Sequence, residues 1–137
     1  MIRGSCLCGA VTYEIDGDSG AMGHCHCHMC QKGHGAAFAT YVNVRWDQFR
    51  LLSGAEDITR YASSEGTTRT FCRVCGSNLQ FIRDNKPGFG IAAGSLDSDP
   101  QVRPTYQIWT SSKVPWWELQ HRDGLVSHAT THGSPAG

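Results

Sequence analysis

The sequence lacks an excess of charge of either sign, and it lacks any long apolar run. Its 137 residues carry 12 Lys and Arg against 12 Asp and Glu, which gives a formal net charge of zero. Without a basic field the chain has nothing to neutralise a phosphate backbone, so we expect no nucleic-acid partner. No stretch approaches the roughly 20 apolar residues that cross a bilayer, so we expect no membrane partner either.

The opening residues also lack the apolar segment of a secretory signal, so we expect a cytoplasmic protein. The chain has seven cysteines, an odd number that cannot be fully paired in disulfides within one chain. A reducing compartment disfavours disulfides, and clustered cysteines there more often bind metal or act as redox groups. The apolar fraction is only 39 % and there are 16 glycines, which favours a turn-rich domain whose modest core is supported by metal.

Strand signals dominate the chain, and no alternation of strands and helices favours a doubly wound fold. Segments rich in alternating, β-branched or aromatic residues predict strands over residues 10–15, 36–44, 46–52, 58–62, 67–71, 79–82, 90–93 and 106–109. Residues 24–35 predict a knuckle and a short helical turn that ends at Gly33 or Gly35. We therefore expect a mainly β domain of packed antiparallel sheets with few short helical turns.

No repeat and no second domain is visible. Residues 1–125 are expected to form a single zinc-binding domain. From residue 126 the composition changes to Ser, His, Ala, Thr, Gly and Pro, so residues 126–137 predict a flexible C-terminal tail.

The seven cysteines fall into three groups along the sequence. These groups are Cys6 and Cys8, then Cys25, Cys27 and Cys30, then Cys72 and Cys75 followed by Gly76. Short C-x-x-C knuckles let two sulfurs converge on one ion, and a following glycine eases the tight turn. Two partitions remain open: the outer pairs form one four-cysteine site and leave three cysteines, or one pair joins part of the middle triplet.

The first partition uses every cysteine and predicts two kinds of site. Four thiolates complete a tetrahedron and connect the N-terminus to mid-chain as a structural zinc site. Three thiolates leave a fourth position open for water or substrate, which is the pattern of catalytic zinc. A nearby histidine could instead close the triplet, and the candidates are His24, His26, His28 and His34.

Three segments resemble the glutathione-dependent formaldehyde-activating enzyme family, also called the CENP-V/GFA domain. They are residues 4–11 (GSCLCGAV), 25–30 (CHCHMC) and 71–77 (FCRVCGS), with smaller matches at 93–97, 108–109 and 112–116. The resemblance covers about residues 3–120. It implies a Mss4-like (β-tent) fold with antiparallel sheets pinned by zinc, and two zinc ions per chain.

The resemblance also implies which cysteines hold each ion. It places the structural zinc on Cys6, Cys8, Cys72 and Cys75, and the second zinc on Cys25, Cys27 and Cys30. The implied activity is that of a zinc-dependent carbon–sulfur lyase, which adds a small thiol such as glutathione to formaldehyde or a related electrophile. The implied product is S-hydroxymethylglutathione or a similar adduct.

In an enzyme of this kind the three cysteines of the second site are the catalytic residues, and a neighbouring histidine moves the proton. We predict His26 for that role, with His28 and His34 as alternatives. Lys32 or Arg73 can meet a substrate carboxylate, and Trp109, Trp116 and Trp117 can wall a pocket. Two other hypotheses stay open: a non-catalytic module that carries glutathione or binds a protein, and a purely structural zinc protein.

Overall fold

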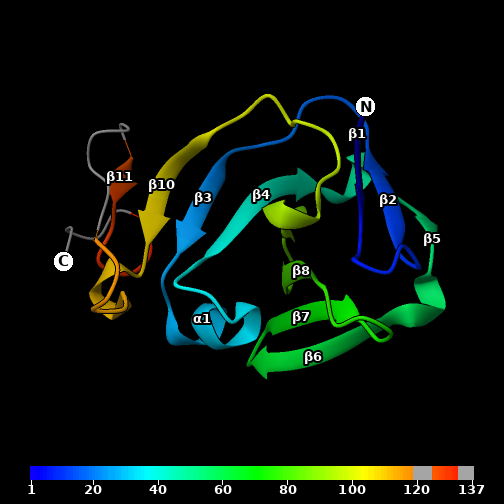
Figure 1. Cartoon of the computed structure of the whole chain (residues 1–137). Helices are drawn as coiled ribbons and strands as arrows, with labels where there is room; N and C mark the ends of the chain where they lie inside the picture. Colours follow the sequence, from blue (N-terminus) through cyan, green and yellow to red (C-terminus); the bar gives the residue numbers. More distant parts are fainter. Residues whose placement is uncertain (119–124, 133–137) are drawn as a thin grey trace. The chain divides into compact units, whose positions relative to one another are not determined.

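The computed structural model describes residues 1–118 and 125–132, and these form two compact units (Figure 1). The first unit contains residues 1–20 and 42–102, and the second contains residues 21–41 and the chain from 103 onward. The structure is mainly β with a single α-helix in the described part, which confirms the predicted fold class. No helix among the described residues is both long enough and apolar enough to cross a bilayer.

A three-stranded antiparallel sheet begins the first unit. Its order is β1-β2-β5, with bounds Ile2–Ser5, Thr12–Ile15 and Phe49–Ser53. Val11, Tyr13 and Ile15 are buried, as their alternation predicts. Glu14, on the opposite face, is buried too, because it pairs across the strands with Arg50 of β5.

Four consecutive antiparallel strands also belong to the first unit. They are β6 (Ile58–Ser64), β7 (Thr67–Cys72), β8 (Asn78–Arg83) and β9 (Gly88–Ala92). The predicted hairpin around residues 63–66 is confirmed, and Gly66 adopts a positive φ of 73° in its turn. Short 3-10 turns connect other strands: η1 (Trp46–Gln48), η2 (Ala55–Asp57) and η3 (Ala93–Ser95).

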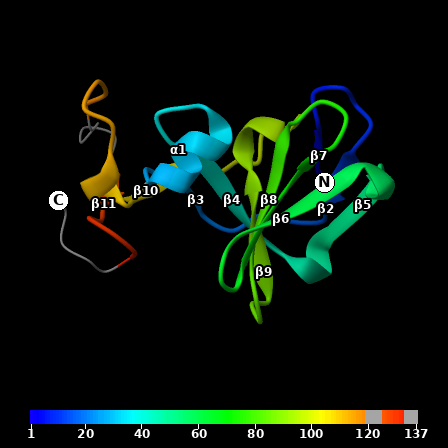
Figure 2. The ribbon, with the colours of Figure 1, turned by 90° about the horizontal axis from the view of Figure 1, so that it is seen from below.

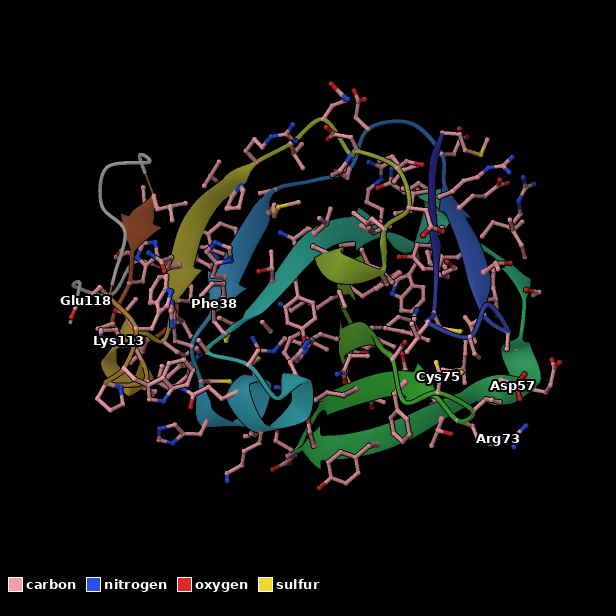
Figure 3. All side chains as sticks on the ribbon, viewed as in Figure 1. Phe38, Asp57, Arg73, Cys75, Lys113 and Glu118 are labelled. Carbon is pink, nitrogen blue, oxygen red and sulfur yellow. The ribbon has the colours of Figure 1, made fainter. Side chains whose placement is uncertain are left out.

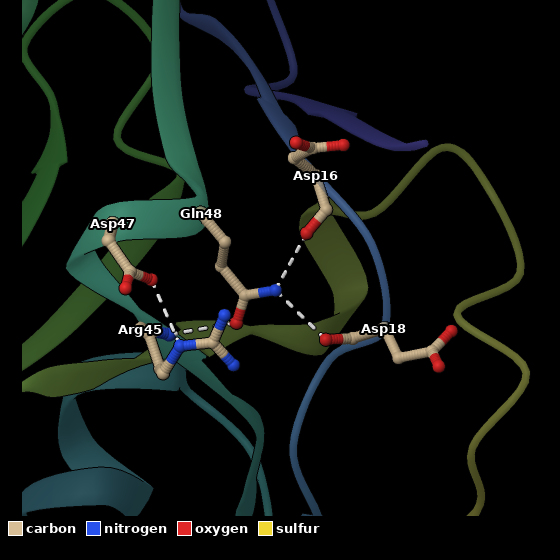
Figure 4. Close-up of polar contacts among 5 residues, drawn as sticks. All are labelled: Asp16, Asp18, Arg45, Asp47 and Gln48. Carbon is tan, nitrogen blue, oxygen red and sulfur yellow. Dashed lines mark hydrogen bonds and ion pairs between the residues drawn. The ribbon is translucent and has the colours of Figure 1, made fainter.

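Gln48 fixes the loop that follows β2 (Figure 4). Its side-chain amide donates hydrogen bonds to the backbone carbonyls of Asp16 and Asp18 at 2.8 and 2.9 Å. Its side-chain oxygen accepts the backbone N–H of Arg45 at 3.0 Å. The buried amide is therefore satisfied on both sides, as a polar group removed from water requires. A glutamine in a 3-10 turn thereby supports a loop about 30 residues earlier in the sequence.

The second unit is built around a parallel pairing that the sequence did not suggest. Strand β10 (Pro104–Ile108) runs parallel to β3 (Met22–Cys25) on one side and to β11 (Val126–Ser127) on the other. Both views show β11 next to β10 (Figures 1 and 2). The unit also contains helix α1 (His28–His34) and the turn η4 (Thr110–Ser112), and β4 (Ala39–Arg45) begins in it.

Helix α1 ends where the sequence predicted one of its two stops. Gly35 has a left-handed conformation (φ 59°, ψ 41°) and its N–H donates to the carbonyl of Gln31. At the other end of the chain, residues 133–137 of the predicted flexible tail lie outside the described residues. Within 126–132 the chain forms β11, and the single-domain assignment of residues 1–125 stays a prediction.

Candidate metal centres

The outer cysteine pairs meet in the first unit. Cys6 and Cys8 lie in the turn after β1, and Cys72 and Cys75 lie at and after the end of β7. All four sulfurs are within 4.8 Å of one another. The sulfur of Cys8 is 3.6 Å from that of Cys6 and 3.8 Å from that of Cys72. The structure thus brings together the four residues that the resemblance assigned to the structural zinc.

Two similar turns present these sulfurs. Gly9 follows one pair with φ of 80°, and Gly76 follows the other with φ of 79°. The N–H of Gly9 donates to the carbonyl of Cys6, and the N–H of Gly76 donates to the carbonyl of Cys72. These left-handed positions favour glycine because a side chain there would be strained. Gly76 therefore has the role in its knuckle that the sequence predicted, and Gly9 has the same role in the other.

The sulfur separations fit a tetrahedral thiolate site. A metal–sulfur bond of about 2.3 Å implies sulfurs about 3.8 Å apart in a tetrahedron. The observed 3.6 and 3.8 Å agree with that spacing and are far beyond the roughly 2.05 Å of a disulfide. All seven cysteines are free thiols. The donor set and its geometry therefore fit a metal such as zinc.

Arg73 lies in the second knuckle but is already paired. Its guanidinium forms an ion pair with Asp57 of η2, and its backbone N–H donates to the carbonyl of Asp57 at 2.7 Å. Figure 3 shows this pair near Cys75.

A hydrogen bond with the Ser77 hydroxyl lowers the pKa of Cys75 to about 5, which favours the thiolate that a metal requires.

The middle triplet forms a second cluster, in the second unit. Cys25 ends β3, Cys27 is the N-cap residue of α1, and Cys30 lies in the first turn of that helix. Their sulfurs are within 4.8 Å of one another, and the N–H of Cys30 donates to the sulfur of Cys27 at 3.3 Å. Cys25 and Cys30 are buried while Cys27 is partly exposed. Both cysteine clusters could therefore bind metal.

The crowding of these thiols itself favours a cation. Hydrogen bonds with the sulfurs of Cys27 and Cys30, together with burial, raise the pKa of Cys25 far above its usual range. Without a compensating charge, three adjacent thiols cannot all ionise. A bound divalent metal removes that obstacle, because its charge stabilises each thiolate directly.

No histidine nitrogen belongs to this cluster in the part of the chain that the structure describes. His24 Nδ1 lies 2.8 Å from the Thr40 hydroxyl, and His34 Nε2 lies 2.9 Å from the Tyr41 hydroxyl. His28 is exposed on α1. Among the described residues, the alternative in which a histidine closes the triplet therefore finds no support in this geometry, and the cluster consists of three sulfurs.

His26 occupies a different environment from the one its sequence position suggested. Its exposed fraction is 0 %, and its Nε2 lies 2.8 Å from the side-chain oxygen of Gln107, which is equally buried. Its ring packs against Phe38 and Trp117, with centroids 5.1 and 5.4 Å away. Because the amide oxygen accepts, Nε2 carries the proton, and Nδ1 has no partner among the described residues. Burial lowers the pKa of His26, so the ring is neutral.

Of the three candidate tryptophans, Trp117 contributes to packing. The centroid of its ring lies 5.0 Å from that of Phe38, and its carbonyl accepts a hydrogen bond from the ammonium of Lys113 at 2.7 Å. Trp116 is largely exposed and Trp109 is partly exposed. Lys32, the other cation considered for a substrate carboxylate, is exposed on α1.

Three residues near the triplet were missed in the sequence. Tyr41 and Ile108 pack against the buried cysteines, and Tyr41 carries the hydrogen bond with His34. Gln31, one residue after Cys30, donates to the carbonyls of His26 and Ser112 at 2.6 and 2.9 Å. Gln31 connects His26 to Ser112, which lies 81 residues after Gln31. Such a distant contact produces no local sequence pattern, so the sequence could not have predicted it.

Known proteins were compared with this chain. A family model described as glutathione-dependent formaldehyde-activating enzyme matches residues 1–112, which include all seven cysteines. An uncharacterized lyase of Schizosaccharomyces pombe is 30 % identical over 126 residues, covering 91 % of this chain and 90 % of that protein. A crystal structure of a Rhodobacter sphaeroides protein is similar with a TM-score of 0.58 and 27 % identity, covering 71 % of this chain and 89 % of that one.

Proposed function

The chain belongs to the glutathione-dependent formaldehyde-activating enzyme family, and we propose that it is a zinc-dependent carbon–sulfur lyase acting at the three-cysteine cluster. Its thiol partner would be a small molecule such as glutathione, and its electrophile formaldehyde or a related aldehyde. The lyase name of the S. pombe relative supports the reaction class. The observation that carries the proposal is the difference between the clusters: among the residues that the structure describes, one has four sulfurs and the other has three sulfurs and no histidine.

In this proposal Cys6, Cys8, Cys72 and Cys75 hold a structural zinc, and the triplet holds the second. Zinc on three thiolates supplies a Lewis acid with a soft open position that suits a thiol sulfur or an aldehyde oxygen. Cys27 is the least buried residue of the three, so substrate would approach from its side. A reducing compartment such as the cytoplasm would keep all seven thiols free for metal binding.

The reaction itself is a simple addition. A carbon–sulfur bond forms, the carbonyl π bond breaks, and the thiol proton ends on the former carbonyl oxygen. The protein has to align two small reactants and move one proton between them. Alignment alone lowers the entropic part of the barrier, because both reactants are held on one site.

For the proton, His34 and Tyr41 are placed better than His26. Tyr41 packs against the cysteines, and its hydroxyl lies 2.9 Å from His34 Nε2 on a partly exposed ring. The tyrosine hydroxyl can therefore pass a proton between substrate and His34 Nε2. His26 is enclosed by aromatic rings and already bonded to Gln107, so its predicted catalytic role would have to work through its buried Nδ1.

The test is adduct formation from glutathione and formaldehyde with substoichiometric zinc-loaded protein. We expect many turnovers per chain above the uncatalysed rate, and loss of that excess in Cys27→Ser. Met29→Leu is the matched control, because Met29 is an exposed neighbour on the same helix outside the cluster. Unchanged activity in Cys27→Ser would refute the site. At most one adduct per chain would instead identify a glutathione carrier.

A further inference from the structure

A short segment near the C-terminus, residues 126–132, is held tightly within the second unit. We call it the C-terminal strap. Its strand β11 pairs in parallel with β10, with Tyr106 opposite Val126 and Gln107 opposite Ser127. The N–H of His128 then donates to the carbonyl of Gln107 at 2.8 Å. The family model ends at residue 112, so the strap lies outside the matched region.

The strap also receives hydrogen bonds from the turn after β10. Three consecutive backbone N–H groups donate to strap carbonyls: Trp109 to Thr130 at 2.7 Å, Thr110 to His128 at 3.0 Å and Ser111 to Ala129 at 3.0 Å. Two side chains repeat the pattern, since the hydroxyls of Thr110 and Ser111 donate to the carbonyls of His128 and Ala129 at 2.9 and 2.6 Å. Residues 109–111 are therefore all hydrogen-bonded to the strap.

The backbone of this turn is strained at its first position. Trp109 has a left-handed conformation (φ 57°, ψ 37°), which is unfavourable for a bulky residue with a Cβ atom. Such a conformation persists only where the surroundings enforce it. Here the hydrogen bonds of residues 109–111 to the strap supply that enforcement.

The residues before and after 109–111 are Ile108 and Ser112, and both contact the segment that carries the three-cysteine cluster. On one side, Ile108 packs against the cysteines, and its carbonyl accepts the N–H of His26 at 3.0 Å. On the other side, the carbonyl of Ser112 accepts the Gln31 amide, which also donates to the carbonyl of His26. His26 lies between Cys25 and Cys27. The hydrogen bonds that fix its backbone therefore lead to residues 108 and 112, on either side of the segment bonded to the strap.

We propose that the C-terminal strap is a positioning element of the three-cysteine site, a role that rests on the metal site of the proposed function. The strap fixes residues 109–111, and residues 108 and 112 transmit that constraint to the backbone that carries the sulfurs. Contacts beyond the ligands commonly change metal affinity 10–100-fold, because they orient the donors. The strap therefore tunes the second site and leaves the four-cysteine site unaffected.

The experiment uses the full chain with Thr110→Val and Ser111→Ala combined, which removes both hydroxyl donors to the strap. The matched control combines Thr110→Ser and Ser111→Thr, which keeps both hydroxyls. Two readouts are compared: amide hydrogen exchange at residues 109–111, and Co²⁺ titration followed by the thiolate absorption bands. A Cys30→Ser variant assigns the part of the spectrum that belongs to the three-cysteine site.

We expect exchange at residues 109–111 to be at least about tenfold faster in the Val/Ala variant, and Co²⁺ affinity at the three-cysteine site to fall about tenfold or more. The Ser/Thr control should resemble wild type, and the four-cysteine bands should be unchanged in all. If the double variant also loses those bands, Thr110→Val alone provides the same comparison.

Two results would overturn the proposal. One is unchanged Co²⁺ affinity despite faster exchange, which would separate the strap from the site. The other is exchange at residues 109–111 that is rapid in wild type or unaltered by the variants, because the hydrogen bonds would then not secure the turn. Neither readout needs turnover, so absence of lyase activity with altered Co²⁺ binding would refute the proposed function and leave the strap's role standing.

Discussion

Replacing one cysteine in each cluster should affect stability very differently. The sulfurs of Cys8 and Cys72 meet although 64 residues separate them, whereas the triplet connects residues only five apart. In the loop-entropy treatment of cross-links, closing a loop of about 64 residues is worth about 4 kcal/mol and closing five about 2 kcal/mol. Cys72→Ser, at a fully buried ligand, should therefore cost about 2 kcal/mol more than Cys30→Ser.

The assay is thermal unfolding of both variants with stoichiometric zinc, alongside zinc analysis of the purified proteins. At roughly 3 °C per kcal/mol for a chain of this size, we expect a Tm about 6 °C lower in Cys72→Ser than in Cys30→Ser. Cys30→Ser should keep one zinc and its fold. Equal losses in both variants, or a Cys72→Ser protein that retains two zinc ions and the wild-type Tm, would refute the division into a structural and an open site.

Three further outcomes follow from single contacts. Burial raises the pKa of Tyr13 to about 12 from its usual 10, so folding favours its protonated form. This contribution to stability is complete below pH 10 and is lost as the pH rises through 12. Unfolding measured across this pH range should show the loss in the wild type and should not show it in Tyr13→Phe. Gly23→Ala would place a Cβ against the Tyr106 ring and should cost about 1–3 kcal/mol in urea unfolding, and the same change in a Tyr106→Ala background should cost much less. At the left-handed Trp109, Gly should be about 1 kcal/mol more stable than Ala, and equal stabilities would remove the claim of strain.

Much of the first unit was predictable because its strands are sequential neighbours. The hairpin of β6 and β7 has strand signals on both sides of a glycine turn, and local pairing needs no distant information. Strands β1 and β3 were missed for opposite reasons. Strand β1 is only four residues long and ends at the first cysteine knuckle. Strand β3 contains Gly23 and pairs in parallel with β10, about 80 residues later, so its own residues show no alternation.

The two cysteine clusters could be predicted from the sequence, and their surroundings could not. Cysteine spacing encodes a knuckle locally. Counting ligands left two partitions open, and the family resemblance selected the division into four and three that the structure shows. The environment of His26 depends on Gln107, and that of His34 depends on Tyr41. These partners have no distinctive pattern, so a histidine beside two cysteines appeared available in the sequence although its ring is fully buried in the structure.

The central claim is that the three-cysteine cluster holds a zinc whose fourth position takes a thiol. The most direct measurement is a crystal structure of the zinc-loaded protein soaked with glutathione, with zinc located by its anomalous signal. The account predicts two zinc ions per chain and a glutathione sulfur about 2.3 Å from the zinc on Cys25, Cys27 and Cys30. A fourth ligand from the chain itself, with glutathione absent from that zinc, would contradict it.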